Sequence, residues 1–194
     1  MVDRDAMLIQ QLKQAISETV SEFMTYPVDF LYESDIQSLL FAKLRHEMRD
    51  VRFRSEAKDV QRFFKFVPNI NPVKTEYPLS LNGSRARFDV AVLSNQQDPT
   101  LKIWNQFCRI AIEIKLWQPD GTGALPFDDL KKLQTYCQLC NSNKRAFTGI
   151  AMLFVHPGAE QWLKSISGIE SEVSFPYDDV AFHVVGSSRW YEVR

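Results

Sequence analysis

The sequence predicts an α/β fold in which a mixed β-sheet is flanked by helices. Apolar, β-branched segments at 87–93, 110–116 and 147–155 have the composition of strands. Segments with apolar side chains every three or four residues, which is the period of a helix, alternate with them along the chain. This alternation of helices and strands is typical of layered α/β proteins.

The length and composition are those of a globular protein. The chain has 194 residues, 45% hydrophobic and 24% charged, so we expect one domain spanning 1–194 with a substantial core. The net charge of -1 gives no general attraction to nucleic acid, so any such contact must use a local basic surface. No apolar segment approaches the ~20 residues of a membrane helix, and the charged start of the chain is unlike a signal peptide. We therefore expect a cytoplasmic protein that does not bind membranes.

Two helices are predicted before the first strand. The apolar stripe of 5–24 predicts a helix. The N-terminal segment 1–26 that contains this helix is expected to pack on the core. A second stripe predicts a helix over 31–48, and Glu33 lies on that stripe near the helix start, whereas Asp35 lies off it and is expected to be solvated. A carboxylate at Glu33 either interacts with the helix dipole or points into a site, and both interpretations stay open.

The segment 49–65 is strongly basic and has interleaved phenylalanines. A basic, aromatic surface suits contacts with phosphates and bases. The alternative, which we favour, is a solvated face over core phenylalanines.

A β-hairpin is predicted after this segment. The strand at 73–79 is expected at an edge of the sheet, because Pro78 cannot donate to a ladder. The turn signal at 82–83 connects it to the strand at 87–93.

Two arginines precede the acid of the second hairpin strand. Arg85, Arg87 and Asp89 alternate, so they are predicted to share one face. The arginines either pair with neighbouring acids or neutralise a phosphate.

The rest of the chain continues the alternation. After the third strand, at 110–116, acids in the first turn mark a helix over 127–140. The fully apolar segment 147–155 is predicted to be a central strand, followed by a short helix at 158–166 and a last strand at 180–185.

Two charges interrupt the apolar strand at 110–116. Glu113 and Lys115 are two residues apart, so both side chains point to the same face of the strand. Burying these two charged side chains costs free energy of desolvation, which is unfavourable unless the charges serve a function. The similar triplet at 56–58 lies among polar residues and is typical of a solvated helix surface. The alternative for Glu113 and Lys115 is a structural ion pair within the sheet.

The acids of neighbouring strands predict a cation site. Asp89 and Glu113, with a backbone carbonyl and waters, would provide the oxygen ligands that Mg²⁺ or Mn²⁺ prefers. Such a cation lowers the pKa of a bound water and neutralises charge on a phosphate. Lys115, expected to be protonated, could orient the attacking water or stabilise the transition state. Glu76 and Glu33 could extend the acid cluster, and repulsion among so many acids favours a cation.

Taken in order, these features resemble the PD-(D/E)xK superfamily of restriction-endonuclease-like nucleases. The resemblance rests on Glu33, Glu76, Asp89, the triplet Glu113-Ile114-Lys115 and a following helix that bears Lys131 and Gln134. The predicted element order from 31 to 155 matches the αβββαβ core of that family, with a mixed central sheet. Phe88 stands where many members have proline.

The resemblance implies a role for each of these residues. Asp89, Glu113 and the backbone carbonyl of Ile114 would bind Mg²⁺ or Mn²⁺, together with Glu76. Lys115 would be the lysine of the motif and Glu33 the helix glutamate. Gln134 or Lys131 would assist from the following helix, and Arg85, Arg87 and Lys131 would contact nucleic acid.

The function expected from these residues is hydrolysis of phosphodiester bonds in DNA by a metal-dependent nuclease. One alternative is a catalytically silent nuclease-like module that binds nucleic acid or a partner protein. Another is that the acids form structural ion pairs only. A homodimer would suit an enzyme that cuts both strands.

Overall fold

The computed structural model describes residues 4–55, 57–63, 69–81, 84–118, 127–156, 159, 180–185 and 190–193. The predicted turn at 82–83, the predicted helix at 158–166 and part of the basic segment lie outside these residues. The elements are α1 (Arg4–Thr25), η1 (Pro27–Asp29), α2 (Glu33–Glu47), β1 (Phe53–Arg54), α3 (Lys58–Phe63), β2 (Asn69–Ile70), β3 (Val73–Leu81), β4 (Ser84–Leu93), η2 (Ile103–Asn105), β5 (Cys108–Trp117), α4 (Phe127–Ser142), β6 (Thr148–Val155), β7 (Val180–Val185) and β8 (Trp190–Val193).

The main sheet has six strands in the order β3-β4-β5-β6-β7-β8. Strand β6 pairs in parallel with β5 and β7, and the other neighbours are antiparallel. The predicted mixed α/β fold with flanking helices is therefore confirmed, as are the edge position of β3 and the central position of β6. Strand β8 was not predicted, because its four residues are too short to show a period.

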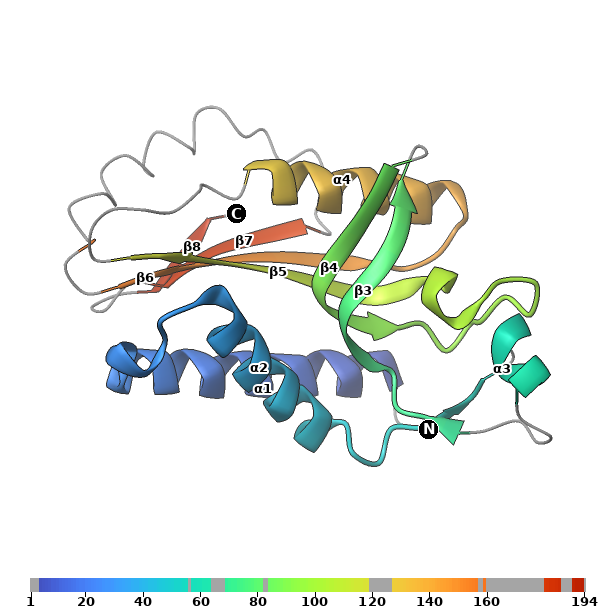
Figure 1. Ribbon diagram of the computed structural model, residues 1–194, viewed down its shortest axis with the longest axis horizontal. Helices are drawn as coiled ribbons and strands as arrows, with labels where there is room; N and C mark the ends of the chain where they lie inside the picture. Colours follow the sequence, from blue (N-terminus) through green and yellow to red (C-terminus); the bar gives the residue numbers. More distant parts are fainter. Residues whose placement is uncertain are drawn as a thin grey trace.

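Helices cover both faces of the sheet (Figure 1). Helices α1 and α2 lie against one face, and α4 lies against the other. Strand β5 alternates between the two layers: Ile110, Ile112 and Ile114 join the cluster under α1 and α2, whereas Ala111 and Trp117 join the cluster under α4. Each fully buried isoleucine stabilises the fold by roughly 1.5–3 kcal/mol.

The hairpin is irregular where it meets the site. In β4, Phe88 and Ala91 belong to the same core cluster although they are three residues apart, so the alternation of faces is interrupted at Asp89. The Arg87 side chain is 69% exposed, whereas Asp89 is half-buried. Opposite, Glu76 has a positive φ of 47°, a conformation that costs a non-glycine residue about 1–3 kcal/mol and often marks a functional site.

The start of α2 is fixed by Asp35. One carboxylate oxygen, Oδ2, accepts the backbone N–H groups of Leu31 at 2.9 Å and Tyr32 at 2.8 Å. The expectation that Asp35 is merely solvated is therefore wrong, because it satisfies two donors at the helix start. This contact also fixes the backbone that carries Glu33.

The basic segment forms β1, α3 and their connections. Its described arginines and Lys58 are exposed, while Phe53 packs partly against the core. Within the described residues, no helix has the length and apolarity needed to cross a bilayer.

Candidate functional site

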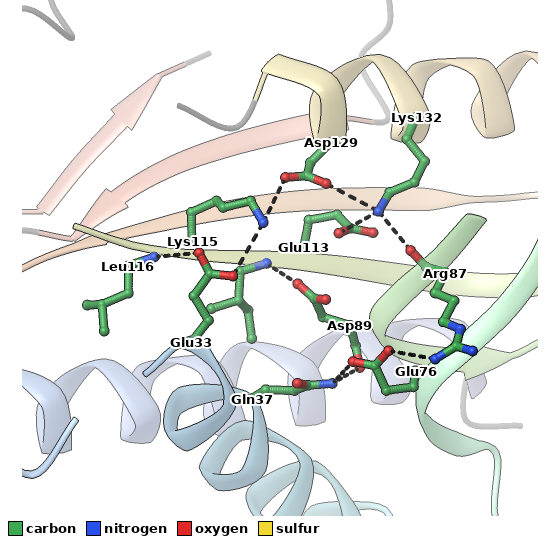
Figure 2. Close-up of polar contacts among 11 residues, drawn as sticks. Glu33, Gln37, Glu76, Arg87, Asp89, Glu113, Lys115, Leu116, Asp129 and Lys132 are labelled. Atoms are coloured by element: carbon green, nitrogen blue, oxygen red, sulfur yellow. Dashed lines mark hydrogen bonds and ion pairs between the residues drawn. The ribbon is translucent and has the colours of Figure 1, made fainter. Parts of the chain in front are cut away.

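Charged side chains from four separate elements meet where β4 and β5 separate (Figure 2). They are Glu33 of α2, Asp89 of β4, Glu113 and Lys115 of β5, and Asp129 and Lys132 of α4. The structure thus brings together three of the four acids that the sequence singled out, with Lys115, whereas the fourth acid, Glu76, lies one contact further out. It adds two residues of α4 that the sequence analysis missed.

Glu113 is the most deeply buried member of this cluster. Its side chain is 2% exposed, and its Oε2 atom lies 2.8 Å from Nζ of Lys132. The other oxygen, Oε1, is buried without a hydrogen-bond partner. Burial and the neighbouring charge of Asp89 outweigh the attraction of Lys132 and raise the pKa of Glu113 to about 9. At neutral pH this carboxyl group therefore holds a proton.

Asp89 lies where β4 and β5 separate. The pairing of these strands ends at Val90 and Ile112, and the Asp89 carboxylate then accepts the backbone N–H of Ile114 at 2.7 Å. The Asp89 carbonyl accepts the Gln37 side chain of α2 at 2.8 Å. Burial raises the pKa of Asp89, and the hydrogen bond from Ile114 opposes that shift.

Lys115 bridges two helices across the site. Its Nζ atom lies 3.3 Å from Asp129 of α4 and 3.4 Å from Glu33 of α2. Burial lowers the pKa of Lys115, but the carboxylates of Asp129 and Glu33 outweigh burial and leave the pKa above its ordinary value. The ammonium group is therefore charged at neutral pH, and 23% of the side chain is exposed.

Glu33 points toward the site and not only along its own helix. Besides the ion pair with Lys115, its Oε1 atom accepts the backbone N–H of Leu116 at 3.4 Å. The side chain is 46% exposed, so the predicted position on the buried stripe is wrong. Of the two interpretations left open by the sequence, this geometry favours the acid directed into a site.

Glu76 forms an outer contact of the cluster. Its carboxylate accepts the Gln37 side chain at 3.0 Å and pairs with Arg87 at 3.6 Å. Because Gln37 also holds the Asp89 carbonyl, Glu76 is connected to Asp89 through this glutamine. Gln37 lies one turn after Glu33, and this spacing was the signal that could have identified it.

Helix α4 contributes different residues from those predicted. Asp129 and Lys132 are 3.2 Å apart, and the Lys132 Nζ atom also donates to the Arg87 carbonyl at 2.7 Å. Lys131 is exposed and Gln134 is half-buried. The side chain of Arg85 lies outside the described residues.

The donor set fits a hard divalent cation held mainly by two carboxylates. Among the described residues, no three histidine, cysteine or acidic side chains are grouped to hold a metal ion by themselves. Mg²⁺ needs only one or two carboxylates, because it keeps several of its waters. Once Glu113 releases its proton, the four carboxylates and two ammonium groups of the cluster leave a formal charge of -2. That charge and the partnerless Oε1 atom of Glu113 are what one divalent cation would balance.

Comparisons with known proteins identify no relative. No model of a protein family matches the chain, and searches of curated proteins and of solved structures find no similar protein.

Proposed function

We propose that this protein is a metal-dependent nuclease of the PD-(D/E)xK type that hydrolyses phosphodiester bonds of DNA. One observation carries the proposal: Glu33, Asp89, Glu113 and Lys115, which are up to 82 residues apart in the chain, lie together where β4 and β5 separate. With the short elements β1, α3, β2 and η2 set aside, the order α2, β3, β4, β5, α4, β6 supports the αβββαβ core that the resemblance implies. A binding surface has no need of a buried and a half-buried acid beside a charged lysine.

Each residue has a chemical role in this proposal. Asp89, Glu113 and the Ile114 carbonyl would hold Mg²⁺ or Mn²⁺, which when bound lowers the pKa of water and neutralises phosphate charge. Lys115 is charged and aimed into the site, where it can orient a water and stabilise the negative transition state. Glu33 holds that ammonium group in place from the opposite side.

The second candidate is a catalytically silent module of the same fold. One observation favours it: Lys132 already lies 2.8 Å from Glu113 and 3.2 Å from Asp129, so an ammonium group neutralises part of the charge that a cation would balance. Such a module would bind nucleic acid or a partner protein without hydrolysis.

A cleavage assay separates the two candidates. Supercoiled plasmid and single-stranded DNA are incubated with Mg²⁺, Mn²⁺ or EDTA, and the native protein is compared with Lys115→Ala. The exposed Lys13 of α1 provides the matched control, Lys13→Ala. A nuclease cuts only with metal, loses about 10²-fold or more of its rate in Lys115→Ala, and keeps its rate in Lys13→Ala.

Folding must be measured in the same samples. If the folded native protein cuts neither substrate with either metal, the nuclease proposal is wrong and the silent module replaces it. If Lys115→Ala only lowers the unfolding temperature while cutting persists, Lys115 is a structural ion-pair partner.

A further inference from the structure

The short helix η2 contacts both helix α3 and the edge strand β3 (Figure 1). Its first residue, Ile103, donates its backbone N–H to the buried carboxylate of Asp59 on α3 at 2.7 Å. The Ile103 carbonyl accepts the hydroxyl group of Tyr77 on β3 at 2.6 Å. The Ile103 side chain packs partly against the core cluster under α4. The backbone at this point is therefore fixed by three separate contacts.

The two neighbours of Ile103 direct a cation and an aromatic ring toward the solvent. Lys102 is exposed, and Trp104 is 42% exposed. The Lys102 Nζ atom lies over the indole ring of Trp104, 5.3 Å from its centroid. Single exposed hydrophobic side chains are common and need no function. This indole differs because a cation lies over it and its backbone is already fixed, so a ligand that binds there pays little for ordering the protein.

Helix α3 adds two further cations next to η2. The backbone N–H of Lys58 donates to the Leu101 carbonyl at 2.8 Å, which places the start of α3 beside Lys102. Lys58 and Arg62 are four residues apart on α3, so they lie on the same side of the helix, and both are exposed. In the described part of the chain, no carboxylate forms an ion pair with Lys58, Arg62 or Lys102. These three cations and Trp104, together called the η2 surface, therefore form a basic, aromatic patch on a protein whose net charge is -1.

The η2 surface lies on the same side of the sheet as the candidate site. Glu113 points toward the α4 layer, because its carboxyl group contacts Lys132 of α4. Ile103 of η2 packs against the core cluster of that same layer. Tyr77, whose hydroxyl group holds Ile103, pairs across the hairpin with Phe88, the residue before the acid that β4 contributes to the site. The η2 surface and the site are therefore connected along one side of the molecule.

We propose that the η2 surface binds single-stranded nucleic acid, with an unpaired base stacked on Trp104 and phosphates beside Lys58, Arg62 and Lys102. This proposal rests on the proposed function, because both take nucleic acid as the ligand. Aromatic side chains flanked by cations suit single strands, since every base can stack and every nucleotide carries a phosphate. A duplex offers phosphates to the cations but no unstacked base to the indole. The η2 surface therefore prefers single strands.

Binding of a fluorescently labelled oligothymidine in EDTA tests the stacking contact. Fluorescence anisotropy is measured with the native protein, Trp104→Ala, Trp104→Phe and the matched control Leu139→Ala, which truncates an exposed apolar side chain of α4. Trp104→Ala weakens binding about tenfold, because stacking of one base is lost. Trp104→Phe keeps most of the affinity, since a phenyl ring also stacks, and Leu139→Ala keeps all of it.

The salt dependence of the same binding tests the cations. Lys102→Gln reduces the slope of log K against log salt by about 0.7, the value for one phosphate contact on a single strand. Lys13→Gln, which replaces an exposed lysine of α1, leaves the slope unchanged. Unfolding curves of all variants coincide with the native curve, because the substituted side chains are exposed, so any loss of binding comes from the surface itself.

Three results overturn the η2 surface. The first is an unchanged affinity for oligothymidine in Trp104→Ala. The second is a duplex of equal length that binds as tightly as the single strand, because stacking on the indole then contributes nothing. The third is the absence of any binding by the folded native protein, which would leave the exposed indole to a partner of another kind.

Cleavage of single-stranded DNA in Mg²⁺ separates failure of the η2 surface from failure of the proposed nuclease. If the protein cuts and Trp104→Ala raises KM without changing kcat, both proposals hold. Cutting with the same KM in Trp104→Ala and in the native protein rejects the η2 surface alone. Trp104-dependent binding without any cutting supports the η2 surface as part of a binding module and rejects the catalytic proposal.

Discussion

The buried carboxyl group of Glu113 binds its proton more tightly in the folded protein than in the unfolded chain. Its pKa rises from an ordinary value of 4.5 to about 9, because burial and the charge of Asp89 disfavour ionisation. A raised folded-state pKa contributes stability that is complete below pH 4.5 and is lost as the pH rises toward 9. The free energy of unfolding should therefore fall across this interval.

Substitution of Glu113 by glutamine tests this pH dependence. For one bound proton, the free energy of unfolding falls by up to about 1.4 kcal/mol per pH unit. Glu113→Gln should remove most of this pH dependence. The measurement is urea denaturation between pH 6 and pH 8 in EDTA. Identical slopes in the native protein and the variant would show that Glu113 is ionised in the folded state.

The two strand acids of the site, Asp89 and Glu113, could be predicted from sequence, whereas their helix partners could not. Asp89 and Glu113 stand out because carboxylates interrupt apolar strands, where desolvation is costly. Asp129 and Lys132 lie on a helix whose other charged residues, such as Lys131, are exposed. Only the packing of α4 on the sheet distinguishes Lys132 from Lys131.

Within α2, the position of Glu33 depends on the cap made by Asp35. Replacing Asp35 by alanine leaves the N–H groups of Leu31 and Tyr32 without their acceptor. We expect a loss of about 1 kcal/mol in the free energy of unfolding. Chemical denaturation measures this loss, and the exposed neighbour Ser34 supplies the control Ser34→Ala. Equal effects of the two substitutions would contradict the cap.

In α4, two adjacent lysines should differ sharply in their effect on stability. Lys132→Met removes the donor to Glu113 and to the Arg87 carbonyl, so we expect a loss of about 1–3 kcal/mol. Lys131→Met, at an exposed position, should change stability by less than about 0.5 kcal/mol. Denaturation curves of the two variants provide the comparison, and a similar loss in both would mean that the contacts of Lys132 contribute nothing.

For the whole molecule, a bound divalent cation should increase stability, and more so at higher pH. Binding at Asp89 and Glu113 requires both carboxylates to be ionised, so Mg²⁺ must displace the proton of Glu113. At 100 times its dissociation constant, a ligand that binds only the folded protein adds about 2.7 kcal/mol. The rise in unfolding temperature with Mg²⁺ should be larger at pH 8 than at pH 6. It should disappear in Glu113→Gln, and a rise of equal size in that variant would place the cation elsewhere.

The sequence predicts the central part of the fold better than its ends. Segment 147–155 is long and apolar, segment 110–116 is apolar apart from Glu113 and Lys115, and the two lie in the adjacent strands β5 and β6. The interruption of β4 at Asp89 could not be predicted, because it depends on the separation of two strands and on a hydrogen bond to Ile114. Local patterns contain no information on such a contact between distant residues.

The exposed edge of the sheet has a consequence for association between copies of the chain. Pro78 lacks the N–H group that a neighbouring strand would need, and the left-handed backbone at Glu76 breaks the flat row of donors and acceptors along β3. Such an edge is a poor template for intermolecular strand addition. The β3 edge is therefore protected against aggregation and against a dimer formed by pairing of its strands.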